Sequence, residues 1–175
     1  GARQVIAIDT ATPRLDLAHR HGATDIAASD VAAAREMVAR LTNGRMLDVV
    51  FDVTGNPAAL APATRLVRKL GRVILLGDTT TPSRQRLGPR IVADSISILG
   101  IHGTMFPATA SVFAPWTAPA MMDLFFTYLS QGRMRVADLV TLRADPRQAP
   151  EVYARLLRDR SAIGGVLFDW SALGE

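Results

Sequence analysis

Seven short apolar runs, rich in β-branched residues, recur along the chain, and segments with a helical period separate most of them. The runs cover residues 5–8, 25–28, 47–53, 72–76, 95–101, 139–142 and 165–168. Strands that alternate with helices of about 10–15 residues form βαβ units around a parallel sheet. The run Val49-Val50-Phe51 lacks polar alternation, as expected for a strand covered on both faces. The sequence therefore predicts an α/β fold with a doubly wound parallel sheet.

Proline and glycine positions predict where several helices begin and end. Thr12 can cap the first helix, and Pro13 stands at its first position, where a missing N–H is tolerated. A second helical pattern covers residues 57–70 and ends at Gly71, and Pro62 inside it predicts a kink or a late start. We therefore expect one long helix before the run at 72–76.

The second half of the chain combines two irregular segments with two helices. Residues 78–90 and 102–119 lack any period and predict loops, the second of them rich in aromatic side chains and proline. An apolar helix over residues 120–129 follows, and Gly132 lies just behind it. Asp145 and Pro146 predict the start of the last helix.

Composition excludes several classes of protein. The chain has 175 residues, 49% of them hydrophobic, which suffices for one sizeable core. It has no cysteine, so disulfides and thiolate metal sites are excluded. No apolar run approaches the roughly 18 residues that a membrane-spanning helix needs, and the default expectation is a cytoplasmic protein. The chain has a net charge of +4, and its arginines are scattered along the sequence without aromatic residues between them. This pattern argues against a nucleic-acid partner.

The first apolar run ends on a carboxylate. Residues 4–8 are followed by Asp9 and then by an amphipathic helical segment. An acid at the carboxyl end of the second strand of a dinucleotide-binding unit accepts hydrogen bonds from the adenosine ribose and repels a 2′-phosphate. The glycine loop G-x-G-x-x-G that should precede such a strand does not occur in these 175 residues. We therefore expect a partial dinucleotide-binding unit.

Several motifs follow one another at characteristic spacing. They are Gly1-Ala2-Arg3-Gln4-Val5-Ile6-Ala7-Ile8-Asp9, Asp48-Val49-Val50-Phe51-Asp52-Val53-Thr54-Gly55, Gly71-Arg72-Val73-Ile74-Leu75-Leu76-Gly77, Ile98-Leu99-Gly100-Ile101 and Ala162-Ile163-Gly164-Gly165-Val166-Leu167. In this order they resemble the coenzyme domain of the medium-chain dehydrogenase/reductase family, which contains the zinc-dependent alcohol dehydrogenases. The resemblance covers nearly the whole chain and implies a Rossmann-type sheet that lacks its first strand and glycine-loop helix.

The resemblance also implies a set of cofactor-binding residues. Asp9 would bind the adenosine ribose of NAD and disfavour NADP, and Arg14 would flank that ribose. Val53, Thr54 and Gly55 would border the adenine or the nicotinamide ribose. The remaining positions would lie against the nicotinamide end at the carboxyl edge of the sheet, and they are Leu76, Gly77, Ile101 and Gly103. No catalytic residue and no metal ligand is assigned within the chain.

Each of these polar residues also has a purely structural interpretation. Asp9 can cap the turn that follows its strand, and Arg14 can be a solvated charge on a first helical turn. Asp52 at a strand end is expected to cap the following helix rather than to act in catalysis. His102 is a lone histidine after a strand, which is more often structural than an acid or base.

The resemblance places the catalytic machinery outside this chain. In zinc-dependent relatives the metal ligands and the proton relay belong to a separate N-terminal domain, so residues 1–175 would form one partial dinucleotide-binding domain of a longer enzyme. The isolated segment is then expected to be inactive. The missing first strand is central in the order 3-2-1-4-5-6, so its absence should leave two strand edges free.

The resulting hypothesis is an oxidoreductase that transfers a hydride between NAD and a small alcohol, polyol or carbonyl substrate. Zinc-free quinone-reductase-type relatives are disfavoured by Asp9, because many of them prefer NADPH. A methyltransferase that uses S-adenosylmethionine and a non-catalytic nucleotide-binding or assembly module remain alternatives. The resemblance further implies a homo-oligomer that associates through the sheet edge around residues 95–103.

Overall fold

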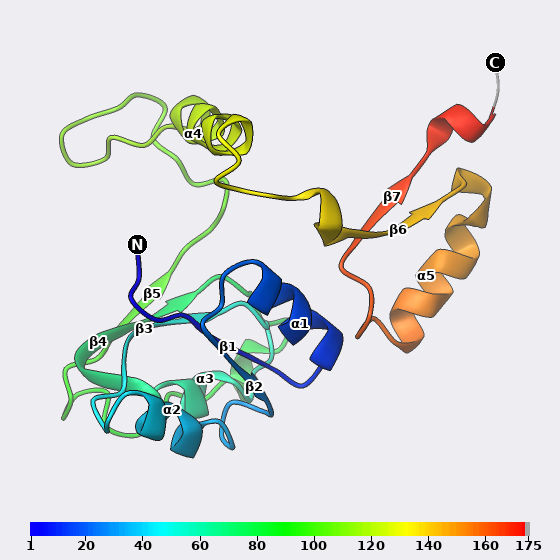
Figure 1. Ribbon diagram of the computed structural model, residues 1–175. Coiled ribbons are helices and arrows are strands. Elements are labelled where there is room, and N and C mark those ends of the chain that lie inside the picture. Colours follow the sequence, from blue (N-terminus) through cyan, green and yellow to red (C-terminus); the bar gives the residue numbers. More distant parts are fainter. Residues whose placement is uncertain (174–175) are drawn as a thin grey trace. The chain divides into compact units, whose positions relative to one another are not determined.

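The structure is a computed structural model that describes residues 1–173 (Figure 1). The chain divides into two compact units, which are described separately. One unit joins residues 1–28 to the chain from Met121 onward, and the other contains residues 29–120. All strand pairs in the described residues are parallel, which confirms the predicted α/β class.

The first unit contains two βαβ arrangements. Strands β1 (Ile6–Asp9) and β2 (Asp25–Ala28) pair in parallel, and helix α1 (Thr12–Arg20) connects them. Strands β6 (Val140–Ala144) and β7 (Gly165–Phe168) pair likewise, and helix α5 (Ala149–Arg158) connects them. Leu15 is almost fully buried, as an apolar residue on the inner face of α1 should be.

The second unit is built on a three-stranded sheet. Strand β4 (Val67–Leu75) lies between β3 (Leu47–Asp52) and β5 (Ser97–Gly100). Helices α2 (Arg35–Leu41) and α3 (Leu60–Ala63) belong to the same unit. Its core cluster consists of Leu60, Val67, Val73 and Ile96, with three partly buried side chains of the sheet packed against it.

Strands β1 and β3 belong to separate sheets, one in each unit. Within residues 1–173, β1 pairs only with β2, and β3 pairs only with β4. Phe51 on β3 remains 59% exposed. Each of the two strands thus keeps one free edge, as expected for a sheet without its central strand.

Helix α4 (Ala118–Ser130) confirms the apolar helix predicted for residues 120–129. Gly132 follows it at φ +66°, where glycine avoids the strain of a left-handed conformation. The predicted start of the last helix is confirmed as well. Asp145 forms a capping box with Gln148 over a short 3-10 turn, and α5 follows directly. No helix among the described residues has the length and apolar character needed to cross a membrane.

The prediction of one helix over residues 57–70 is wrong. The helix contains only Leu60–Ala63, and residues 67–75 form β4, so Gly71 lies inside a strand. The Thr64 hydroxyl donates to Ala61 O at 2.8 Å, which gives the chain a local alternative to further helix. Leu47 N donates to Leu66 O at 2.9 Å, and Leu70 N donates to Asp94 O at 2.8 Å. These long-range bonds override the local helical period.

The first helix also begins differently from the prediction. Ala11, rather than Thr12, occupies the N-cap position, and no side chain caps the helix. Thr12 is the first helical residue, so Pro13 stands at the second position rather than the first, still within the turn where its missing N–H is tolerated. The turn before α1 is instead held by Asp9, whose Oδ1 accepts a hydrogen bond from Ala11 N at 2.8 Å.

Candidate functional site

Three strands of the second unit end at one edge of the sheet. The register pairs Asp52 of β3 with Leu75 of β4, and Leu75 with Gly100 of β5. Because the strands are parallel, the segments 53–55, 76–77 and 101–103 leave the sheet at the same carboxyl edge. Open α/β sheets bind their ligands at this edge.

The first two of these segments are in direct contact. Leu76 N and Gly77 N both donate to Asp52 O, at 2.9 and 3.0 Å. A Cβ atom added to Gly77 would lie 2.7 Å from the Val53 carbonyl carbon and 2.8 Å from the Thr54 nitrogen. It would also overlap the Gly55 nitrogen. Only glycine permits the two backbone segments to approach so closely.

Gly55 makes a second close contact between the two loops. Its φ is +62°, and an added Cβ atom would lie 2.6 Å from Asp78 O. The two strand-end loops therefore form one continuous piece of backbone surface. Side chains on this surface reach solvent, since Val53 and Leu76 are both largely exposed.

Asp52 holds the loop from within. It is only 6% exposed, and its Oδ1 accepts from Thr54 N at 2.9 Å and from the Thr54 hydroxyl at 2.7 Å. The prediction that Asp52 caps the following helix is wrong, because its carboxylate bonds within its own turn. The short Asp-x-Thr pattern is the sequence signal for such a turn.

Two substitutions of Asp52 test whether its carboxylate stabilises this turn. In Asp52→Ala the Thr54 amide and hydroxyl lose their shared acceptor, and we expect the free energy of unfolding to fall by about 1–3 kcal/mol. Asp52→Asn keeps a carbonyl oxygen at this position and should retain most of that stability. Urea-induced unfolding of both variants checks the difference. Equal stability of the Ala variant and the unchanged protein would contradict this role.

The third segment at the edge is open. Ile101 N donates to Leu75 O at 3.0 Å, which extends the sheet by one residue. Ile101 is half exposed, and a Cβ atom on Gly103 would meet no atom within 4 Å. His102 Nδ1 lies 2.9 Å from the Thr104 hydroxyl, in a turn of its own. This local contact matches the structural interpretation of His102.

Asp9 and Arg14 lie in the first unit. Arg14 Nη1 is 3.4 Å from Asp9 Oδ2, and Arg14 Nη2 donates to Arg160 O at 3.1 Å. The side chain of Asp9 is 30% exposed. Its oxygens accept the two bonds from Ala11 and Arg14, and a carboxylate has about four acceptor positions. Asp9 thus holds its own turn and still has acceptor capacity that faces solvent.

The nine predicted residues therefore fall into two groups. Seven of them lie at the carboxyl edge of the sheet in the second unit, where the segments 53–55 and 76–77 touch. Asp9 and Arg14 form a pair at the carboxyl end of β1 in the first unit. Among the described residues no three histidine, cysteine or acidic side chains form a group that could hold a metal ion.

Comparison with known proteins identifies the family. The family described as zinc-binding dehydrogenase matches residues 1–119. An L-threonine 3-dehydrogenase of Bacillus licheniformis is 37% identical over 143 residues, which cover 82% of this chain and 38% of that enzyme. A sorbitol dehydrogenase of Bacillus subtilis is 36% identical over 104 residues, which cover 58% of this chain and 29% of that enzyme. The chain spans less than half the length of these curated relatives.

Solved structures show the same fold. An alcohol dehydrogenase from Thermus sp. ATN1 superposes with a TM-score of 0.75 at 24% identity and covers 96% of this chain and 44% of its own. A short chain alcohol dehydrogenase from Escherichia coli, complexed with cofactor NADH, has a TM-score of 0.74 at 19% identity. The match covers 97% of this chain and 45% of that protein. These findings confirm both the Rossmann-like fold and the resemblance, and the chain belongs to the zinc-binding dehydrogenase family.

Proposed function

We propose that this chain is the coenzyme-binding part of an oxidoreductase that transfers a hydride between NAD and an alcohol or polyol. The observation that carries the proposal is the contact between the loops 53–55 and 76–77 at the carboxyl edge of the sheet. Family membership supports it, since the relatives are named for the dehydrogenation of threonine and sorbitol. The methyltransferase and assembly-module alternatives are not favoured by these relatives.

The residues present fit a dinucleotide. Gly55 and Gly77 allow the two strand-end loops to pack directly on each other. The exposed side chains of Val53 and Leu76 beside them give a ribose or nicotinamide ring an apolar surface. NAD would supply the hydride acceptor. Val53, Thr54 and Leu76 would line the nicotinamide half of the cofactor, and Ile101 and Gly103 would border the same half. Their work is to bind and orient the ring and to exclude water from it.

Asp9 carries the preference for NAD over NADP in this proposal. Its free acceptor capacity can take hydrogen bonds from ribose hydroxyls, while its charge would repel a 2′-phosphate. Arg14 holds the carboxylate of Asp9 in place through the 3.4 Å contact. A related structure from Escherichia coli contains NADH, which supports a nicotinamide cofactor in general.

The rest of the enzyme would lie outside these 175 residues. We propose that another segment of the enzyme supplies the central strand of the Rossmann sheet, together with the glycine loop. A separate domain would hold the zinc and the proton relay and would shape the pocket for the alcohol or carbonyl substrate. The protein would be cytoplasmic and would form homo-oligomers through β5, which pairs only with β4 in the described residues.

Titration of the protein from its natural source with NADH, followed by the fluorescence of the reduced nicotinamide, tests the proposal. We expect saturable binding with a dissociation constant of roughly 1 μM to 1 mM, the range of ordinary coenzyme affinities. Addition of NAD with L-threonine, sorbitol or a primary alcohol should then produce NADH. Absence of both binding and turnover in a folded protein would contradict the proposal.

A further inference from the structure

A hollow lies in the second unit. It is at the edge of the three-stranded sheet opposite to the carboxyl edge, which carries the loops 53–55 and 76–77. Its volume is about 840 Å³. It is lined by residues from the start of α2 and from the segments that enter β3, β4 and β5, which are Arg35, Gly44, Arg45, Met46, Thr64, Arg65, Val67, Arg68, Lys69, Pro89, Arg90 and Asp94. Because the three strands are parallel, these entries mark the amino edge of the sheet.

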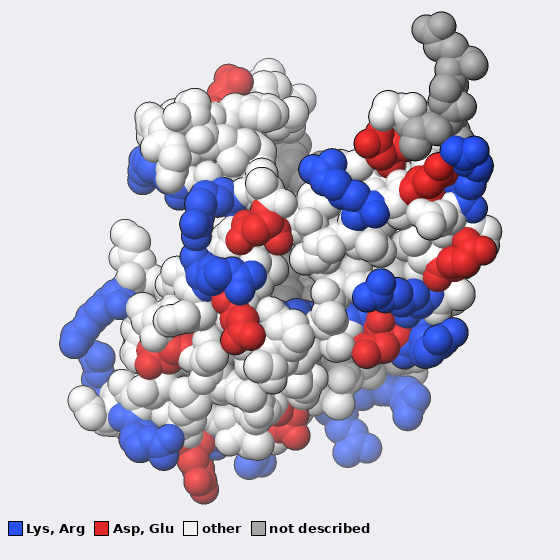
Figure 2. All heavy atoms as spheres, turned by 45° about the vertical axis from the view of Figure 1, so that its right-hand side comes forward, with Lys and Arg blue, Asp and Glu red and all other residues white. Residues whose placement is uncertain are grey.

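The lining of this hollow concentrates the positive charge of the molecule. It contains five arginines and one lysine against a single acid, Asp94, so its formal charge is +5. The whole chain has a net charge of +4, which leaves −1 for all other residues together. On the face shown in Figure 2, basic and acidic side chains are both scattered over the surface.

Among the described residues, two of the six cations form an ion pair with an acid, while Arg45 and Lys69 act on the same two carboxylates only through their charge. Arg90 binds both oxygens of Asp94, at 2.8 and 2.7 Å, and Arg68 pairs with Asp48. These hydrogen bonds lower the pKa of Asp94 and of Asp48, so both carboxylates are ionised. Within residues 1–173 no ion pair involves the other four cations, which are Arg35, Arg45, Arg65 and Lys69.

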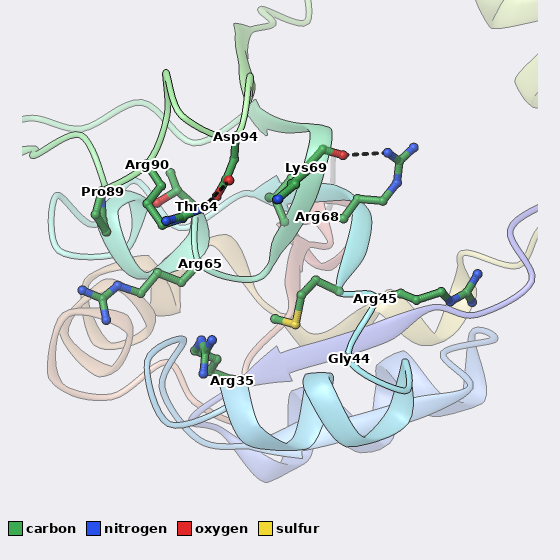
Figure 3. Close-up of a pocket in the computed structure, with 12 residues that line it drawn as sticks. Arg35, Gly44, Arg45, Thr64, Arg65, Arg68, Lys69, Pro89, Arg90 and Asp94 are labelled. Carbon is green, nitrogen blue, oxygen red and sulfur yellow. Dashed lines mark hydrogen bonds and ion pairs between the residues drawn. The ribbon is translucent and has the colours of Figure 1, made fainter.

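The unpaired cations come from different walls of the hollow. Figure 3 shows Arg35 on α2 at one side of the hollow, while Arg65, just before β4, and Lys69, within β4, lie on the other. All three side chains belong to exposed residues. Like charges around one space repel each other, and a bound anion would remove that cost. Such an anion would stabilise the fold by linkage.

We propose that this hollow binds a small molecule that carries two or more phosphate groups. Guanidinium groups match the geometry of phosphate oxygens and bind them in pairs. The volume exceeds what a single phosphate fills and falls in the range of small-molecule sites. No aromatic side chain is among the lining residues, so bases of a nucleic acid would find no stacking surface.

Calorimetric titration of the protein with sodium tripolyphosphate at low ionic strength tests this site. We expect saturable binding with about one anion per chain. In Arg35→Gln/Arg65→Gln the affinity should fall about tenfold or more, because two unpaired donors are removed. Arg84→Gln/Arg86→Gln is the matched control. It removes the same charge from exposed positions in the same unit outside the lining, and the affinity should change less than about twofold.

Three results would overturn the proposal. They are absence of saturable binding, an equal loss of affinity in both double variants, and tighter binding of a short single-stranded RNA than of tripolyphosphate. NADH titrations keep this test separate from the proposed dehydrogenase function. The Arg35→Gln/Arg65→Gln variant should bind NADH as the unchanged protein does, and a parallel loss of NADH and tripolyphosphate affinity in this variant would contradict a site separate from the coenzyme site.

Discussion

Gly77→Ala is expected to lower the free energy of unfolding by about 2–4 kcal/mol and to remove most NADH binding. The three atoms nearest to the added Cβ atom would be backbone atoms of residues 53–55, which cannot turn aside as a side chain can. One of the two strand-end loops must therefore move. That movement would separate the two loops, which together form the surface to which we assign the nicotinamide half of the cofactor.

Gly100→Ala is the control for this substitution. Gly100 also ends a strand of the same sheet, but an added Cβ atom there would meet no atom within 4 Å. We expect its stability and its affinity for NADH to stay close to those of the unchanged protein. Urea-induced unfolding and NADH titration measure both quantities for both variants. Equal effects of the two substitutions would show that the close approach at Gly77 has no special importance.

Asp9→Ser is expected to reduce the preference for NAD over NADP by a factor of about 10–100. The substitution removes charge-assisted hydrogen bonds to ribose hydroxyls, each of which is worth roughly 1.5–3 kcal/mol. It also removes the repulsion of a 2′-phosphate. A serine hydroxyl can still accept the bond from Ala11 N that holds the turn, so the fold should survive.

Asp16→Ser provides the comparison for Asp9→Ser. Asp16 is an exposed residue of α1 in the same unit, so its replacement removes the same charge away from the strand end. The ratio of the NAD and NADP dissociation constants should be unchanged in this variant. An unchanged ratio in Asp9→Ser as well would mean that Asp9 only holds its turn.

The strands were predictable because each is a short apolar run between turn-forming residues. The predicted runs at 25–28 and 165–168 coincide with β2 and β7, and the other strand predictions overlap the observed strands. The helix predicted for residues 57–70 failed although its apolar positions recur with a helical period. Hydrogen bonds from Leu47 and Leu70 to distant residues decided the outcome, and no local pattern reveals them.

The candidate site was predictable in part for a related reason. Residues that follow parallel strands must meet at one edge, so the strand ends locate the loops 53–55, 76–77 and 101–103. The hydrogen bonds that Thr54 donates to the Asp52 carboxylate were missed, although the Asp-x-Thr pattern signals them. The basic hollow was missed because its lining comes from four segments between Arg35 and Asp94, which only the folded chain brings together.

Hydrogen exchange of the protein from its natural source, with and without NADH, tests the central claim most directly. If the carboxyl edge binds the cofactor, NADH should slow exchange of the amides of residues 53–55 and 76–78 and of the turn after Asp9. Slower exchange confined to residues 64–69 and 89–94 would place NADH in the basic hollow instead. That result, or unchanged exchange at saturating NADH, would contradict the assignment of this chain as the coenzyme-binding part of a dehydrogenase.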